Sequence, residues 1–205
     1  MTGPSATGTA AGWRWSLLLP PDWATLPCEP GAGRAAVRRL LDRQLARLPR
    51  DQVATVRRGL ELQLRGLLRQ AAQAGAVELH TSLSLVRGLP VTGTCSVSVL
   101  RGGVDDPRLV AELAAAFAGD GDAVELDVRP LAGLPALRRR RSTELPGEEG
   151  QRPVPATTLD WAVPLPDGEG AVLLSFSTVT APVADELVAL FDAIAGSLQL
   201  APAQD

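Results

Sequence analysis

Apolar and polar residues alternate at the start of the chain, in the segment WRWSLLLPPDWATLP at 13–27. Every second residue from Trp13 to Leu19 is a tryptophan or a leucine, which is typical of a β-strand with one buried face. A Pro-Pro-Asp turn interrupts this strand, and Trp23 and Leu26 then resume an extended segment. The apolar run is far shorter than the roughly 20 residues of a membrane span, so we expect no contact with a membrane.

Two helices are predicted next, because leucine and valine recur every three or four residues. The first covers 33–48 and ends at Pro49, and the second starts from Asp51 as its cap and runs to Gly75. The short connection between them predicts an antiparallel helical hairpin at 31–75.

The rest of the chain shows strand patterns together with two further helical patterns, at 105–119 and 182–200. In 76–86 the apolar residues alternate with Glu78, His80 and Ser82, which predicts a sheet with one wet or polar face. The further strands are expected at 92–100, 123–131, 134–144, 156–166 and 170–179. These elements predict an α+β fold, in which a single antiparallel or mixed sheet carries packed helices and an inserted Arg-rich helical hairpin.

No repeat or linker divides the chain, so we expect one domain over 13–200 with a single shared interior. Residues 1–12 are small, polar or glycine and predict a disordered N-terminal segment, and 201–205 predict a tail.

The composition is that of an ordinary folded protein, with 45% hydrophobic and 21% charged residues. All basic residues are arginine, which GC-rich codons explain better than phosphate recognition does. Cys28 and Cys95 lie far apart without a CxxC motif, so we expect no metal site and no cofactor. The N-terminus lacks the pattern of a secretory signal, and we expect a cytoplasmic protein.

Few residues offer catalytic chemistry. His80 is the only histidine, and it is either a solvated strand residue or a general base of a small-ligand site or enzyme on the polar sheet face. A phosphate-binding P-loop needs a lysine that this chain does not have. We therefore expect a protein that is not an enzyme, and we keep the His80 site as the alternative.

A run of four arginines, Arg138 to Arg141, stands in one of the predicted strands. Alternation sends Arg138 and Arg140 to one face and the other two to the opposite face, while Glu125 and Asp127 alternate on the preceding strand. This arrangement predicts cross-strand ion pairs rather than contacts with nucleic acid.

Charge is segregated along the chain. Residues 31–75 hold ten arginines and three acids, a net charge of +7, while the remainder holds ten arginines and twenty acids, a net charge of −10. The outward helix faces carry the candidate partner-binding residues Arg39, Arg43, Arg50, Arg58, Leu62, Arg65 and Arg69.

These basic faces fit an acidic protein partner, or the acidic part of a second copy, which would make a homo-oligomer. A solvated face, as exposed helices normally carry, is the alternative. We expect no nucleic acid, because the faces lack aromatic residues and the whole chain is acidic.

The order of elements resembles the PsbP-like α/β/α sandwich, whose early strand leads into a P-x-W turn, matched here by Pro21, Asp22 and Trp23. Its last helix often closes on a serine and an apolar residue, as at Ser197 and Leu198. The chain is also similar to uncharacterised actinobacterial proteins, some of which accompany type VII secretion genes. The resemblance implies a non-enzymatic binder or adaptor. Together with the Arg-rich hairpin, it predicts a non-catalytic protein-interaction module, adaptor or chaperone-like, which binds an acidic protein partner.

Overall fold

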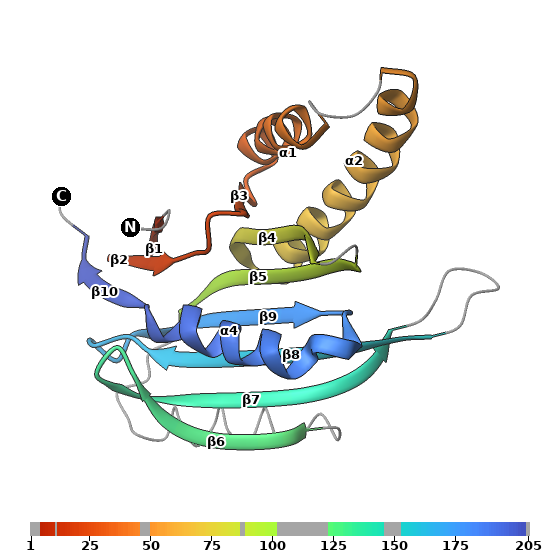
Figure 1. The fold of residues 1–205 in the computed structure, drawn as a ribbon. Coiled ribbons are helices and arrows are strands. Elements are labelled where there is room, and N and C mark those ends of the chain that lie inside the picture. The colour runs from red at the N-terminus through yellow and green to blue at the C-terminus, as the bar shows by residue number, and fades with distance from the viewer. Residues whose placement is uncertain are drawn as a thin grey trace.

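The computed structural model describes residues 5–10, 12–45, 50–86, 89–101, 123–145 and 153–203. Its described elements confirm the α+β class, but the strands form two antiparallel sheets of three and seven strands instead of one (Figure 1). The expected helix at 105–119 lies outside the described residues. None of the helices within the described ranges is long and apolar enough to cross a membrane.

The small sheet joins the two ends of the described chain. Its central strand is β2 (Trp13–Leu18), which pairs with β1 (Ser5–Ala10) and with β10 (Gln199–Pro202). The prediction of disorder before residue 13 and of a tail from 201 is therefore wrong at these two strands. Their main chains pair with β2, and Gly8 is required there, because a Cβ would lie 2.3 Å from the Trp15 ring.

The large sheet has the strand order β3-β4-β5-β9-β8-β7-β6, and every neighbouring pair is antiparallel. Its strands are β3 (Trp23–Pro27), β4 (Ala76–Val86), β5 (Leu89–Arg101), β6 (Ala123–Leu131), β7 (Leu134–Leu145), β8 (Val154–Pro164) and β9 (Gly170–Thr178). The predicted alternation in these segments thus marks real strands.

One face of the large sheet is covered by α4 (Ala184–Gly196), which follows the short 3-10 helix η1 (Ala181–Val183). Figure 1 shows α4 lying across β8 and β9. Its apolar stripe packs into a core that also includes Trp15, Trp161 and Phe176, and the rings of Phe176 and Phe191 stack 5.1 Å apart.

The hairpin of α1 (Pro30–Leu45) and α2 (Arg50–Gln73) stands over the β3–β4 edge of the large sheet (Figure 1). It closes a second core, which lies on the face of the sheet opposite to α4. Leu26 of β3 contributes to this second core. Gly33 allows this close packing, because a Cβ there would lie 2.5 Å from the Leu68 side chain. The described residues thus form separate cores on the two faces of one sheet, and the expectation of a single interior is wrong.

Candidate functional site

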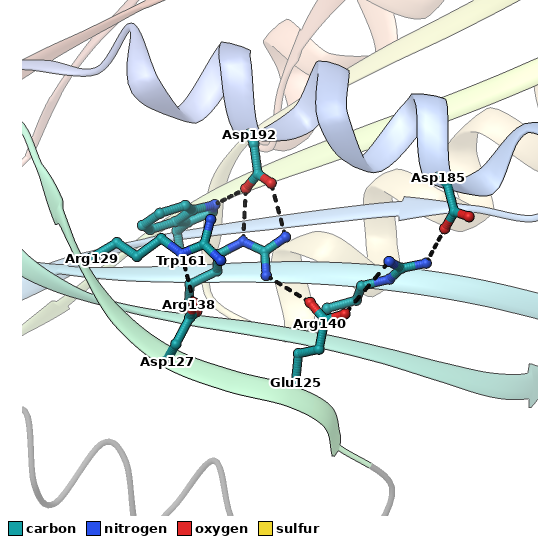
Figure 2. Close-up of polar contacts among 8 residues, drawn as sticks. All are labelled: Glu125, Asp127, Arg129, Arg138, Arg140, Trp161, Asp185 and Asp192. Carbon is teal, nitrogen blue, oxygen red and sulfur yellow. Dashed lines mark hydrogen bonds and ion pairs between the residues drawn. The ribbon is translucent and has the colours of Figure 1, made fainter.

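The four-arginine run forms ion pairs on both faces of β7. Arg138 is only 3% exposed and binds the Asp192 carboxylate of α4 through two hydrogen bonds of 2.8 and 2.9 Å. Trp161 donates a third bond of 3.1 Å to the same carboxylate, as Figure 2 shows. On the opposite face, Arg139 binds Asp160 at 2.9 Å. These contacts connect α4 and β8 to β7.

Glu125 of β6 forms ion pairs with two arginines of the neighbouring strand β7. Its carboxylate lies 3.2 Å from the Arg138 guanidinium and 3.8 Å from that of Arg140, which also pairs with Asp185 of α4 (Figure 2). The predicted cross-strand pairing is confirmed for Glu125. Asp127 instead pairs with Arg129 of its own strand, at 2.6 Å. The hydrogen bond to Asp192 is the main cause that raises the pKa of Arg138, which therefore stays charged and anchors α4.

His80 has no exposed surface and lies beside Trp15 of β2. Its Nδ1 lies 3.1 Å from the Thr25 hydroxyl, its Nε2 lies 3.6 Å from the Glu78 carboxylate, and the Trp15 ring meets its ring edge-on. Burial lowers the pKa of His80 to about 4 and raises that of Glu78 to about 7. The expectation of a wet face around His80 is wrong, because β2 covers it, and a fully buried imidazole offers no surface to a substrate.

The outward face of α2 carries a row of basic residues around one exposed leucine. Arg58, Leu62, Arg65 and Arg69 follow one another at spacings of four, three and four residues, so they share one face of the helix. We call these four residues the α2 stripe. Leu62 is 63% exposed, and Arg65 pairs with Glu61 at 2.6 Å. Arg58 and Arg69 have no acidic partner in the part of the chain that the structure describes.

The other predicted partner-binding residues do not join the α2 stripe. Arg39 and Arg43 are exposed on α1, and Arg43 lines a separate hollow of about 540 Å³ together with Asp22 and Trp23. Arg50 is the first residue of α2, and its side chain lies outside the part of the chain that the structure describes. The hairpin thus presents two basic surfaces on different sides.

Arg34, which the sequence reasoning did not single out, is the α1 residue that meets the α2 stripe. It lines a hollow of about 390 Å³ with Arg65 and Arg69, which we call the arginine hollow. Its remaining lining residues are Cys28, Pro30, Leu68 and Ala72. Arg34 and Arg43 are nine residues apart and so lie about 180° apart around α1. The nine-residue spacing can be read from the sequence, whereas the orientation of α1 relative to α2 cannot.

A third hollow, the α2 groove, lies between the other side of α2 and strands β4, β5 and β9. It has a volume of about 510 Å³. Leu60, Leu64 and Leu67 form its helical side, and hydroxyl side chains that include Thr81, Thr94 and Ser177 form its sheet side. Thr94 and Ser177 bond to each other at 2.7 Å. No sequence signal pointed to this groove, because it requires β5 to pair with β9.

Comparison with known proteins gives a fold and no family. The sequence matches no protein-family profile, and a search of curated proteins finds no match. Among solved structures, the chain is similar to LpqN of Mycobacterium tuberculosis, a protein described as involved in cell envelope biogenesis. The two share 14% identity and a TM-score of 0.52, over 97% of this chain and 91% of LpqN. This likeness shows a known α/β fold.

A protein of Bacteroides thetaiotaomicron is similar at 10% identity with a TM-score of 0.49. The match covers 100% of this chain and 50% of the Bacteroides protein.

Proposed function

We propose that this protein is a non-catalytic interaction module that binds an acidic protein partner through the α2 stripe. The observation that carries the proposal is the row Arg58, Leu62, Arg65 and Arg69 on one helix face, with Leu62 63% exposed at its centre. An exposed apolar residue surrounded by arginines suits a partner surface with an apolar contact and an acidic rim.

The charge distribution supports this proposal. The hairpin segment 31–75 carries +7 in a chain whose net charge is −3, so the hairpin attracts anions although the whole protein does not. Arg58 and Arg69 are available for intermolecular pairs, because no acid within the described ranges neutralises them. Their position on a rigid helix keeps the spacing of the charges fixed.

Charge reversal tests the proposal. The double variant Arg58→Glu/Arg69→Glu should lose the partner in affinity purification from the native host at low salt, and the wild type should lose it at high salt. The variant Arg39→Glu/Arg43→Glu makes the same change in charge on the other side of the hairpin and should keep the partner. Equal capture by all three proteins, or loss in the control variant alone, would show that the α2 stripe is not the binding surface.

A second candidate function is the binding of a small neutral ligand in the α2 groove. Its volume of about 510 Å³ falls within the range of about 300–1,000 Å³ for small-molecule sites, and apolar walls with a few hydroxyls are typical of them. This candidate replaces the site around His80, which has no exposed surface.

Two exposed leucines on different sides of α2 provide a matched test of this second candidate. Leu67 lines the groove and is 41% exposed, whereas Leu62 is 63% exposed on the α2 stripe. With the neutral fluorescent probe N-phenyl-1-naphthylamine, Leu67→Gln should weaken binding several-fold and Leu62→Gln should not. Equal effects of the two substitutions would contradict ligand binding in the α2 groove.

We further propose that the fold is of the PsbP-like kind and that the protein acts in the cytoplasm as an adaptor, with a link to secretion. The P-x-W turn at Pro21–Trp23 supports the first statement. LpqN is described in terms of the cell envelope, which makes fractionation of the native host the direct check on location. Recovery in the envelope fraction would overturn the cytoplasmic assignment.

A further inference from the structure

The arginine hollow differs from the rest of the basic surface, because three arginines line it together with several apolar residues. Arg34 comes from α1, and Arg65 and Arg69 come from α2, so the hollow exists only in the folded hairpin. Cys28 and Leu68, which also line it, are 8% and 7% exposed. The thiol of Cys28 adds no negative charge near neutral pH, since burial raises its pKa.

The guanidinium groups around the hollow have unused hydrogen-bonding capacity. Arg65 donates through Nη2 to Glu61, but its Nε is buried without an acceptor in the described part of the chain. Arg34 and Arg69 form no ion pair with any acid in those same ranges. Glu61 offsets one of the three positive charges, and Glu78 lies near enough to Cys28 to help raise the pKa of its thiol. Arg34 and Arg69 are exposed and can donate hydrogen bonds to an anion that enters the hollow.

We propose that the arginine hollow is a binding site for a small organic anion, one that carries a carboxylate on an apolar body. The carboxylate would accept hydrogen bonds from Arg34 and Arg69 beside the positive charge of Arg65, and the apolar body would lie on Cys28, Leu68 and Ala72. The volume of about 390 Å³ suits a small molecule and is more than one acidic side chain would fill. This site shares Arg65 and Arg69 with the α2 stripe, whereas Arg58 and Leu62 take no part in it.

Nuclear magnetic resonance titration of the full chain with hexanoate tests the site. Saturable shifts of the Arg34, Arg65 and Arg69 side-chain N–H signals are the expected result. Hexanamide lacks the charge and acetate lacks the apolar body, so each should bind at least about tenfold more weakly than hexanoate. Equal binding of all three compounds would overturn the proposal.

Three variants test whether hexanoate binds in the arginine hollow or elsewhere on the basic surface. Arg69→Gln should weaken hexanoate binding about tenfold or more, and Arg58→Gln, which changes the same charge outside the hollow, should leave it unchanged. Ala72→Leu, at an exposed helix position, should occupy part of the hollow and weaken hexanoate binding without a fall in melting temperature. Undiminished binding in folded Ala72→Leu would overturn the site.

A capped peptide, acetyl-Leu-Glu-Leu-amide, distinguishes a free acid from an acidic side chain of a protein. Tighter binding of this peptide than of hexanoate at the same arginines would overturn the small-molecule assignment. Weaker binding of the peptide would support it. Either result leaves the test of the α2 stripe unaffected, since that test measures loss of a protein partner through Arg58 as well as Arg69.

Discussion

His80 is buried and Glu78 is half-buried, and the pKa values of these two residues move in opposite directions. Burial lowers the pKa of His80 from 6.5 to about 4 and raises that of Glu78 from 4.5 to about 7. Between about pH 4.5 and pH 6.5, the folded pair and the unfolded pair each hold one proton. The pair therefore makes the free energy of unfolding nearly independent of pH in this window, although each residue alone would not.

Replacement of either residue should expose the pH dependence that the remaining residue gives to the free energy of unfolding. In His80→Gln, the raised pKa of Glu78 favours the folded state at low pH, so the free energy of unfolding should fall by up to about 3 kcal/mol as pH rises from about 4.5 to about 7. In Glu78→Gln, the lowered pKa of His80 should make stability fall as pH decreases from about 6.5 to about 4. Urea unfolding across this range, taken as each variant minus wild type, measures both slopes. Parallel curves for the two variants would contradict this pairing.

At the scale of elements, Asp192 holds α4 on the large sheet. Its carboxylate binds the nearly buried Arg138 and accepts from Trp161, whereas the side chain of Asp185 is 81% exposed beside Arg140. Asp192→Ala should lower the free energy of unfolding by about 3 kcal/mol, because it leaves a buried charge with too few partners. Asp185→Ala should cost less than about 1 kcal/mol.

Chemical denaturation of the two variants measures this difference. Adding Arg138→Met to Asp192→Ala should recover part of the loss, since no unpaired buried charge remains. Equal, small losses in Asp192→Ala and Asp185→Ala would show that the contact with α4 depends on apolar packing alone.

Periodicity predicted the elements well where one face is apolar. Alternation from Trp13 to Leu19 gave β2, and the leucine spacing gave α1 and α2. It failed for β1, whose sequence SATGTA has no apolar pattern and which forms through main-chain pairing with β2. Alternation also grouped His80 with Glu78 and Ser82, but it does not state which face is covered. Here both faces of the large sheet are covered.

A candidate site within one element could be predicted from the sequence, but a site formed between two packed elements could not. Spacing within α2 placed Arg58, Leu62, Arg65 and Arg69 on one face, because the positions belong to a single helix. The arginine hollow and the contact of Arg138 with Asp192 depend on how two elements pack against each other. Such contacts join residues more than 30 positions apart, and no local pattern in the sequence specifies them.

At the scale of the whole molecule, the central feature is the separation of charge between the hairpin and the rest. Residues 31–75 carry a net charge of +7 and the remainder carries −10, so the protein has a strong electric dipole. The positive end is the hairpin, which stands over one edge of the large sheet (Figure 1). Such a dipole orients an acidic partner before contact and makes association fall with ionic strength. A second copy of the chain would be attracted by the same field.

The salt dependence of binding to the purified partner tests the central claim most directly. We expect the dissociation constant of the wild type to rise steeply between 50 and 500 mM salt, because added salt shortens the Debye length and screens the attraction between the charges. Arg58→Glu/Arg69→Glu should bind more weakly with a much shallower slope, and Arg39→Glu/Arg43→Glu should keep most of the slope of the wild type. The same slope in wild type and Arg58→Glu/Arg69→Glu would contradict binding through the α2 stripe.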